Sequence, residues 1–335
     1  MSSHFNHYVF PVARKVLMIF AIHSVAAGVF GQTEPVPVSE EVFKPSVKLE
    51  LSVPLNSFAL KSLVADSEFG GKTWNASFTP FFAPVAKVSA NTSWGKLSVS
   101  RKLLQKNAFW AMDLKIPLGD ELSIGGFWRN WKGFNLQYSL EDAGANSSSI
   151  SYDNTRQTFD RSDVRFLDRS LNVEYKSSLN IPPEMTEPLK EGKIKLLVSS
   201  VLELRNQELR SSEKLLSEDF ADKFGTESSL SNLLQNSLGA AVGFEFVYEL
   251  NSSQYFWNLD CGWKWIFGDY LYQSLPEVSK QSLGFSAGTD LGYRFKKEDH
   301  VFETFIRFDG TLNKASNIGF SSQYFLLNFS YEKYF

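Results

Sequence analysis

The chain is poor in the residues that most metal sites and many catalytic sites require. Its 335 residues include one cysteine, Cys261, and four histidines. A single cysteine excludes an intramolecular disulfide, and so few soft ligands leave no zinc-type cluster. We therefore predict no metal and no cofactor.

The histidine positions bear on catalysis. His4, His7 and His23 fall within a predicted export signal, which leaves only His300 in the mature chain. A hydrolase of the serine–histidine or aspartate–histidine type needs a positioned imidazole as its general base. His300 follows the charged run 296–299, which is typical of a solvated turn. We therefore do not expect an enzyme.

Clustered charge and long hydrophobic runs are also scarce. The net charge is −3, and no Lys/Arg cluster is present, so we expect no nucleic-acid partner. A mean hydropathy of −0.20 excludes a bundle of long apolar helices. The same value is compatible with a membrane barrel, because its strands place half of their residues on a polar interior.

The N-terminus has the pattern of a secretory signal peptide. Arg14 and Lys15 precede an apolar stretch over 16–30, and small residues lead to a cleavage site before Gln32. The alternative is a membrane anchor, but the stretch is shorter than the ~18 residues that a spanning helix needs. We predict a signal peptide over 1–31, a periplasmic segment over 32–45 and a transmembrane β-barrel over 46–335.

Aromatic residues are abundant, at 15% of the chain, and they alternate with polar residues. A transmembrane strand needs about 9–11 residues that alternate between lipid and interior. In 255–267, one face carries Tyr255, Trp257, Trp263 and Trp265, and the other carries Asp260 and Lys264. The same alternation occurs in segments 193–205, 240–250, 283–295 and 301–309.

The middle of the chain repeats the pattern more weakly. Apolar faces occur over 110–116, 122–128 and 134–140, and the phase slips between Phe166 and Leu171, which indicates a bulge or a polar strand end. We predict an all-β, antiparallel up-and-down barrel of about twelve strands, or fourteen if 46–53 and 72–80 also cross. Tight periplasmic turns are expected at 130–132, 251–254 and 297–299. Long external loops are expected at 141–162, 206–238, 268–281 and 313–321. Segment 178–192 is long for a periplasmic turn.

The last segment places alternating aromatics before a final phenylalanine. Phe329, Tyr331 and Phe335 lie on one strand face. This resembles the signal that the outer-membrane insertion machinery reads, so we expect that machinery and outer-membrane lipid as partners. The alternative is an ordinary amphipathic strand.

Several short motifs resemble an uncharacterised bacterial family of predicted outer-membrane barrels, a domain of unknown function. They are Phe78-Thr79-Pro80, the run 93–100, the run 131–136 and Asp163-Val164-Arg165. The resemblance implies a barrel of the bacterial outer membrane and no catalytic residue.

Charged residues on the predicted interior faces are the best candidates for a functional site. A lining of this kind serves either as a selectivity path for a small solute or as a salt-bridge network that fills a narrow barrel. The signs are balanced, which favours the filler. The candidates are Glu245, Glu249, Asp260, Lys264, Asp290, Arg294, Glu303, Arg307 and Asp309.

The sequence thus favours a structural or surface-exposed outer-membrane protein, with a narrow porin-like passive channel as a variant. A second hypothesis is partner binding through 206–238, where Leu216, Phe220 and Phe224 recur at helical spacing. A third is a secreted soluble β-barrel.

Overall fold

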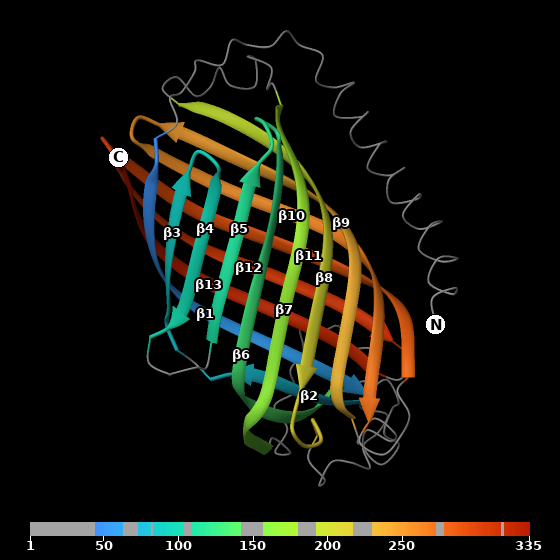
Figure 1. The fold of residues 1–335 in the computed structure, drawn as a ribbon. Helices are drawn as coiled ribbons and strands as arrows, with labels where there is room; N and C mark the ends of the chain where they lie inside the picture. The colour runs from blue at the N-terminus through green and yellow to red at the C-terminus, as the bar shows by residue number, and fades with distance from the viewer. Residues whose placement is uncertain are drawn as a thin grey trace.

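The computed structural model describes residues 44–62, 73–81, 83–103, 109–141, 157–179, 192–216, 230–272, 278–315 and 318–335. In these residues no helix is long and apolar enough to cross a membrane. The predicted signal peptide lies outside the described residues. Thirteen strands form one sheet (Figure 1): β1 Ser46–Ser62, β2 Thr73–Pro80, β3 Val85–Thr92, β4 Gly95–Lys102, β5 Phe109–Pro117, β6 Leu122–Glu141, β7 Gln157–Leu179, β8 Lys193–Arg210, β9 Leu230–Leu250, β10 Ser253–Tyr272, β11 Val278–Lys297, β12 His300–Ala315 and β13 Ile318–Tyr334.

The sheet closes on itself because the last strand pairs with the first. β13 pairs with β1 along its whole length, from Ser46 opposite Tyr334 to Ser62 opposite Ile318. All of the strand pairings are antiparallel. The predicted fold class, an antiparallel β-barrel, is therefore confirmed. Its two rims are called here the Ser46 end and the Ser62 end.

A hairpin makes the barrel wider at one end than at the other. β1 pairs with β3 over 46–52 and with β2 over 58–61, while β6 pairs with β5 over 123–131 and with β2 over 134–141. The β4–β5 hairpin therefore lies between β3 and β6 only near the Ser46 end. The wall there contains β1, β3, β4, β5 and the eight strands β6–β13, which makes twelve. Near the Ser62 end it contains β1, β2 and the same eight, which makes ten.

The predicted turn at 130–132 is wrong, because β6 runs through it without a break. The pairing of β6 with β7 shifts between Lys132 opposite Arg165 and Phe134 opposite Arg161. Gly133 between them has a φ of 83°, a value that favours glycine and marks a bulge. The two strands predicted over 122–128 and 134–140 are therefore one bulged strand.

The bulge reverses which face of β6 is buried. Ile124 and Trp128 are exposed on the outer face, whereas Phe134 and Leu136 are fully buried inside. The even-numbered residues change sides because the two-residue alternation is interrupted at Gly133, where this one residue of β6 lies opposite three residues of β7, 162–164. The bulge predicted between Phe166 and Leu171 is wrong: the pairing of β7 with β6 is continuous from Arg165 to Tyr175, and the pattern changes there because the apolar Phe166 faces inward and the apolar Leu171 faces outward.

Most predicted loops are shorter in the structure because the strands continue further. β8 extends to Arg210 and β9 begins at Leu230, so only 211–229 connects them. The loops predicted at 141–162, 268–281 and 313–321 are shorter for the same reason, because their flanking strands extend into them. The turns at 251–254 and 297–299 are confirmed as tight connections, with Asn251 and Glu298 at positive φ. Of segment 178–192, residues 180–191 lie outside the described part, as does most of the predicted helix that contains Phe220 and Phe224.

Candidate functional site

The side chains inside the barrel change from charged near the Ser46 end to apolar near the Ser62 end. Near the Ser62 end the interior is apolar, and rings from strands that are not neighbours meet there. Phe58 of β1 contacts Phe166 of β7 with ring centroids 3.9 Å apart, and Trp131 of β6 lies 5.4 Å from Phe166. The buried members of this cluster, called here the apolar plug, include Leu60, Trp74, Phe78, Phe134, Leu136, Tyr138, Leu209, Leu215, Leu216, Leu230 and Leu233.

Nearer the Ser46 end, the interior holds charged side chains in alternating order. The guanidinium of Arg294 on β11 donates to Glu303 on β12, with Nε 2.7 Å from Oε2. The other oxygen of Glu303 accepts from Lys48 Nζ of β1 at 2.7 Å. Lys48 Nζ also lies 3.1 Å from Glu50 Oε1. The Glu303 side chain is only 7% exposed, so both of its cations are needed to offset its burial.

This chain of ion pairs continues along the wall to β6. Lys87 Nζ on β3 lies 3.5 Å from Glu50 and 3.2 Å from Asp113 of β5. Asp113 in turn lies 3.9 Å from Arg129 Nη2. Together with Arg294, Glu303 and Lys48, these residues make a path of alternating charge over six strands, β11, β12, β1, β3, β5 and β6. We call the set Arg294, Glu303, Lys48, Glu50, Lys87, Asp113 and Arg129 the ion chain.

A second cluster lies at mid-height on β10–β12. Arg307 Nε lies 2.7 Å from Asp309 Oδ2 and 3.5 Å from Asp290 Oδ1. Asp260 reaches the same space: a Cβ built on Gly288 would lie 2.3 Å from Asp309 Oδ1 and 2.6 Å from Asp260 Oδ1. Three acids thus share the region around one arginine, and a glycine leaves the room for them.

Lys264 reaches across a neighbouring strand. Its Nζ lies 2.7 Å from Glu203 of β8, although β9 separates β8 from β10. The side chain passes over Gly239 of β9, where a Cβ would lie 2.9 Å from Lys264 Cγ. Beside this pair, Arg205 donates two hydrogen bonds of 2.7 Å to Asp168, which is almost fully buried.

The two remaining candidates lie on β9. Glu245 pairs with Lys176 of β7. Glu249 lies 3.0 Å from Lys195 and accepts a hydrogen bond from Gln254. In the described residues, eight of the nine predicted residues therefore form ion pairs in several separate clusters, and Asp260 lies in the same space as Asp309.

Several of these partners were not predicted from the sequence. Lys48, Glu50 and Lys87 were not among the predicted interior residues, and segment 46–53, which contains the first two, was expected only as one of two possible further crossings. A signal was present, because Lys48 and Glu50 alternate with the outward-facing Val47, Leu49 and Leu51. The pairing itself depends on the closure of β1 on β13, which the sequence pattern does not contain.

His300 lies at the first position of β12, beside the turn at 298–299. Its Nδ1 is 2.7 Å from the Tyr331 hydroxyl, and the two rings stack with centroids 5.8 Å apart. In the part of the chain described here, no three His, Cys, Asp or Glu side chains are grouped to hold a metal ion. The expectation that the protein is not an enzyme stays a prediction.

Comparison with known proteins gives similar folds and no family. No family model and no curated protein matches the chain, so the resemblance to the uncharacterised family stays a prediction. Among solved structures, the outer membrane protease OmpT from Escherichia coli is 11% identical, with a TM-score of 0.44 over 90% of this chain and all of that one. The translocator domain of autotransporter NalP from Neisseria meningitidis is 10% identical, with a TM-score of 0.36 over 98% of this chain and 99% of that one. An outer membrane channel from Pseudomonas putida F1 is 9% identical, with a TM-score of 0.28 over 91% of this chain and all of that one.

Proposed function

We propose that the chain is a β-barrel protein of the bacterial outer membrane, with a structural or surface-exposed role and a closed interior. The observation that carries the membrane location is the outer surface of the barrel. Large apolar side chains are exposed on most of the wall strands; they include Leu49, Leu51, Val99, Met112, Trp128, Leu171, Leu204, Phe246, Trp257, Leu291, Ile306 and Phe329. A soluble protein rarely exposes a contiguous apolar patch larger than a few hundred Å².

The height of this belt suits a membrane. On β12 the outward apolar residues run from Phe302 to Leu312. Ten residues of strand span ~33 Å, and a tilt of about 45° reduces this to roughly 23 Å along the axis, close to the ~25 Å apolar band of outer-membrane barrels.

Aromatic rings border the belt near the Ser46 end. Tyr255 lies 6.3 Å from Tyr248 and 5.1 Å from Tyr293, measured between ring centroids, and Phe302 lies 5.2 Å from Tyr331. Rows of this kind are typical of the membrane–water interface. Phe329, Tyr331 and Phe335 belong to the same region, and we propose that the insertion machinery reads them.

Membrane fractionation and heat modifiability test this location. We expect the full chain in purified outer membranes, and the unboiled protein to migrate differently from the boiled protein on a gel. Recovery in the soluble fraction with no mobility shift would overturn the proposal and favour the secreted soluble barrel.

The filled interior supports a closed barrel. The apolar plug occupies the Ser62 half, and the ion pairs occupy the rest. The charged region favours a second candidate, a narrow passive channel, because a polar lining is what a solute path needs. Reconstitution in planar bilayers separates the two: we expect no steady conductance. A conductance whose ion selectivity changes in Arg307→Gln would favour the channel.

Partner binding through the predicted loop 206–238 is tested by a shorter deletion, because β8 and β9 extend into this range. A deletion of 206–238 would remove paired residues of β8 and β9. Deletion of 217–229 leaves both strands, and also Leu215 and Leu216 of the apolar plug, in place. Loss of surface binding with retained heat modifiability would support this alternative.

A further inference from the structure

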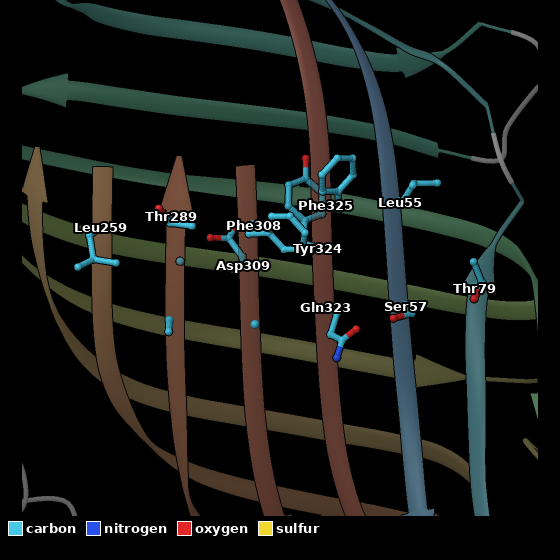
Figure 2. A pocket seen from close by; sticks show the side chains of 13 residues that line it. Leu55, Ser57, Thr79, Leu259, Thr289, Phe308, Asp309, Gln323, Tyr324 and Phe325 are labelled. Atoms are coloured by element: carbon cyan, nitrogen blue, oxygen red, sulfur yellow. The ribbon is translucent and has the colours of Figure 1, made fainter. Parts of the chain in front are cut away.

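A depression of about 640 Å³ lies on the wall formed by β10–β13, β1 and β2. Figure 2 shows its lining side chains on six adjacent strands, from Leu259 on β10 to Thr79 on β2. The volume is within the range of small-molecule sites.

The depression is on the outside of the barrel. Leu55, Leu259 and Phe308 line it, and each is more than 40% exposed on the outer face. At Gly310, a Cβ would meet no atom within 4 Å. On the inner face of the same wall, Asp260 and Asp309 already fill the space over Gly288. The hollow over Gly310 therefore opens toward the surroundings of the barrel.

The lining is polar at one end and apolar at the other. Ser57 lies opposite Gln323, and Gln323 lies opposite Gly310, so these residues form one row across three strands. Thr79 lies beside this row, since Phe78 pairs with Phe58. Phe325, Phe308 and Leu259 follow this row toward the Ser46 end.

The polar end has hydrogen-bonding groups without partners. In the described residues, the side chains of Ser57, Thr79 and Gln323 make no hydrogen bond. Thr289, deeper in the depression, is satisfied by Trp257 and by the Asn258 carbonyl. Polar groups on a membrane-facing surface are costly unless a partner satisfies them.

We propose that this depression is a binding site for one glycerophospholipid, with its ester linkage at Ser57, Thr79 and Gln323 and an acyl chain that runs from the hollow over Gly310 and Ala287 past Phe308 and Leu259. The inference rests on the proposed membrane location. Hydroxyl and amide groups suit the neutral ester oxygens of a lipid. No lysine or arginine is among the lining residues, so a phosphorylated saccharide lipid fits less well.

The test measures lipid retained by the intact protein. The full chain is extracted from membranes in mild detergent and weighed by native mass spectrometry. It is then delipidated and titrated with palmitoyl-oleoyl phosphatidylethanolamine. We expect one bound phospholipid in the native protein, and binding weakened about ten-fold or more in Gly310→Leu and Ala287→Leu, because a leucine side chain occupies the hollow.

The matched control is Ala240→Leu, which adds the same side chain on β9 opposite the outward-facing Trp263 and outside the depression. It should retain the lipid. All variants should keep their heat-modifiable gel shift, which shows that the barrel has assembled.

Several results would overturn the inference. These are equal retention in Gly310→Leu and the native protein, retention of lipopolysaccharide instead of phospholipid, or a dimer of the chain with no lipid. If the native protein is heat-modifiable but carries no phospholipid, the site is wrong and the membrane proposal stands. A soluble native protein with no shift would overturn both.

Discussion

Glu303 illustrates how single residues determine whether charge is tolerated inside this barrel. Its carboxylate lies between Lys48 and Arg294 and accepts from both. Moving charge out of water costs several kcal/mol per ion, and the cost is offset only when each ion has well-placed partners. Removal of such a residue destabilises the protein mainly because its partners are left unpaired inside the barrel. The loss of its own attraction to them is the smaller effect.

Glu303→Ala should therefore lower the free energy of unfolding by about 3–5 kcal/mol, because Lys48 and Arg294 lose their shared buried partner. Guanidinium titration of the protein in lipid vesicles measures this change.

The matched control is Lys195→Ala, which breaks an ion pair whose lysine side chain is 55% exposed. Its effect should be no more than about 1 kcal/mol. Equal effects of the two substitutions would show that the ion chain is hydrated and that its burial carries no cost.

At the scale of elements, the bulge in β6 decides which side chains fill the barrel. The positive φ of Gly133 permits the bulge, and the strand beyond it presents Phe134, Leu136 and Tyr138 to the apolar plug. Without the bulge, these three would face outward together with Trp128.

Gly133→Ala should destabilise the barrel by about 1–3 kcal/mol, because a side chain at this φ is strained. A Cβ there would also lie 2.7 Å from the Phe81 ring. Thermal loss of the unboiled gel mobility measures the effect.

The double variant Gly133→Ala/Phe81→Ala separates the two causes. Relative to Phe81→Ala alone, the glycine substitution should cost less than it does in the native protein, since only the backbone strain remains. An undiminished cost would assign the whole effect to the backbone and would contradict a steric role for the ring.

At the scale of the whole molecule, the outer surface of the barrel is apolar, which is the reverse of a soluble barrel. The interior is filled with side chains. Apolar side chains face outward around the wall, and the interior combines an apolar plug with ion pairs. Both features follow from one alternation of residues, whose inner set changes from charged to aromatic toward the Ser62 end.

Leu291→Arg distinguishes a lipid environment from water. Leu291 is 65% exposed at mid-wall, so in water the change would cost within about 0.5 kcal/mol. In a bilayer an outward arginine near the midplane costs ~2–4 kcal/mol. We expect the larger value in vesicle unfolding.

The control is Leu118→Arg, at a leucine that is 53% exposed beside the turn between β5 and β6. It should have little effect, because the turn lies outside the apolar belt. Equal and small effects at both positions would argue against the membrane location.

The sequence by itself determined the wall of this barrel. Alternation is a local property, since residues i and i+2 of a strand lie on the same face whatever the strand pairs with. Tyr255, Trp257 and Trp263 could therefore be assigned to one face, and Asp260 and Lys264 to the other, without a structure. The antiparallel barrel followed from the repetition of such strands.

The tertiary structure alone decided the partners and the filling. Whether Glu303 meets Lys48 depends on the closure of β1 on β13, some 255 residues apart, and on a register that one inserted residue would change. The bulge at Gly133 shifts the register of β6 against β7, and it turned a predicted outward face into part of the apolar plug. Which residues meet across a closed sheet depends on the register of every strand pair around it. A local sequence pattern does not specify these registers.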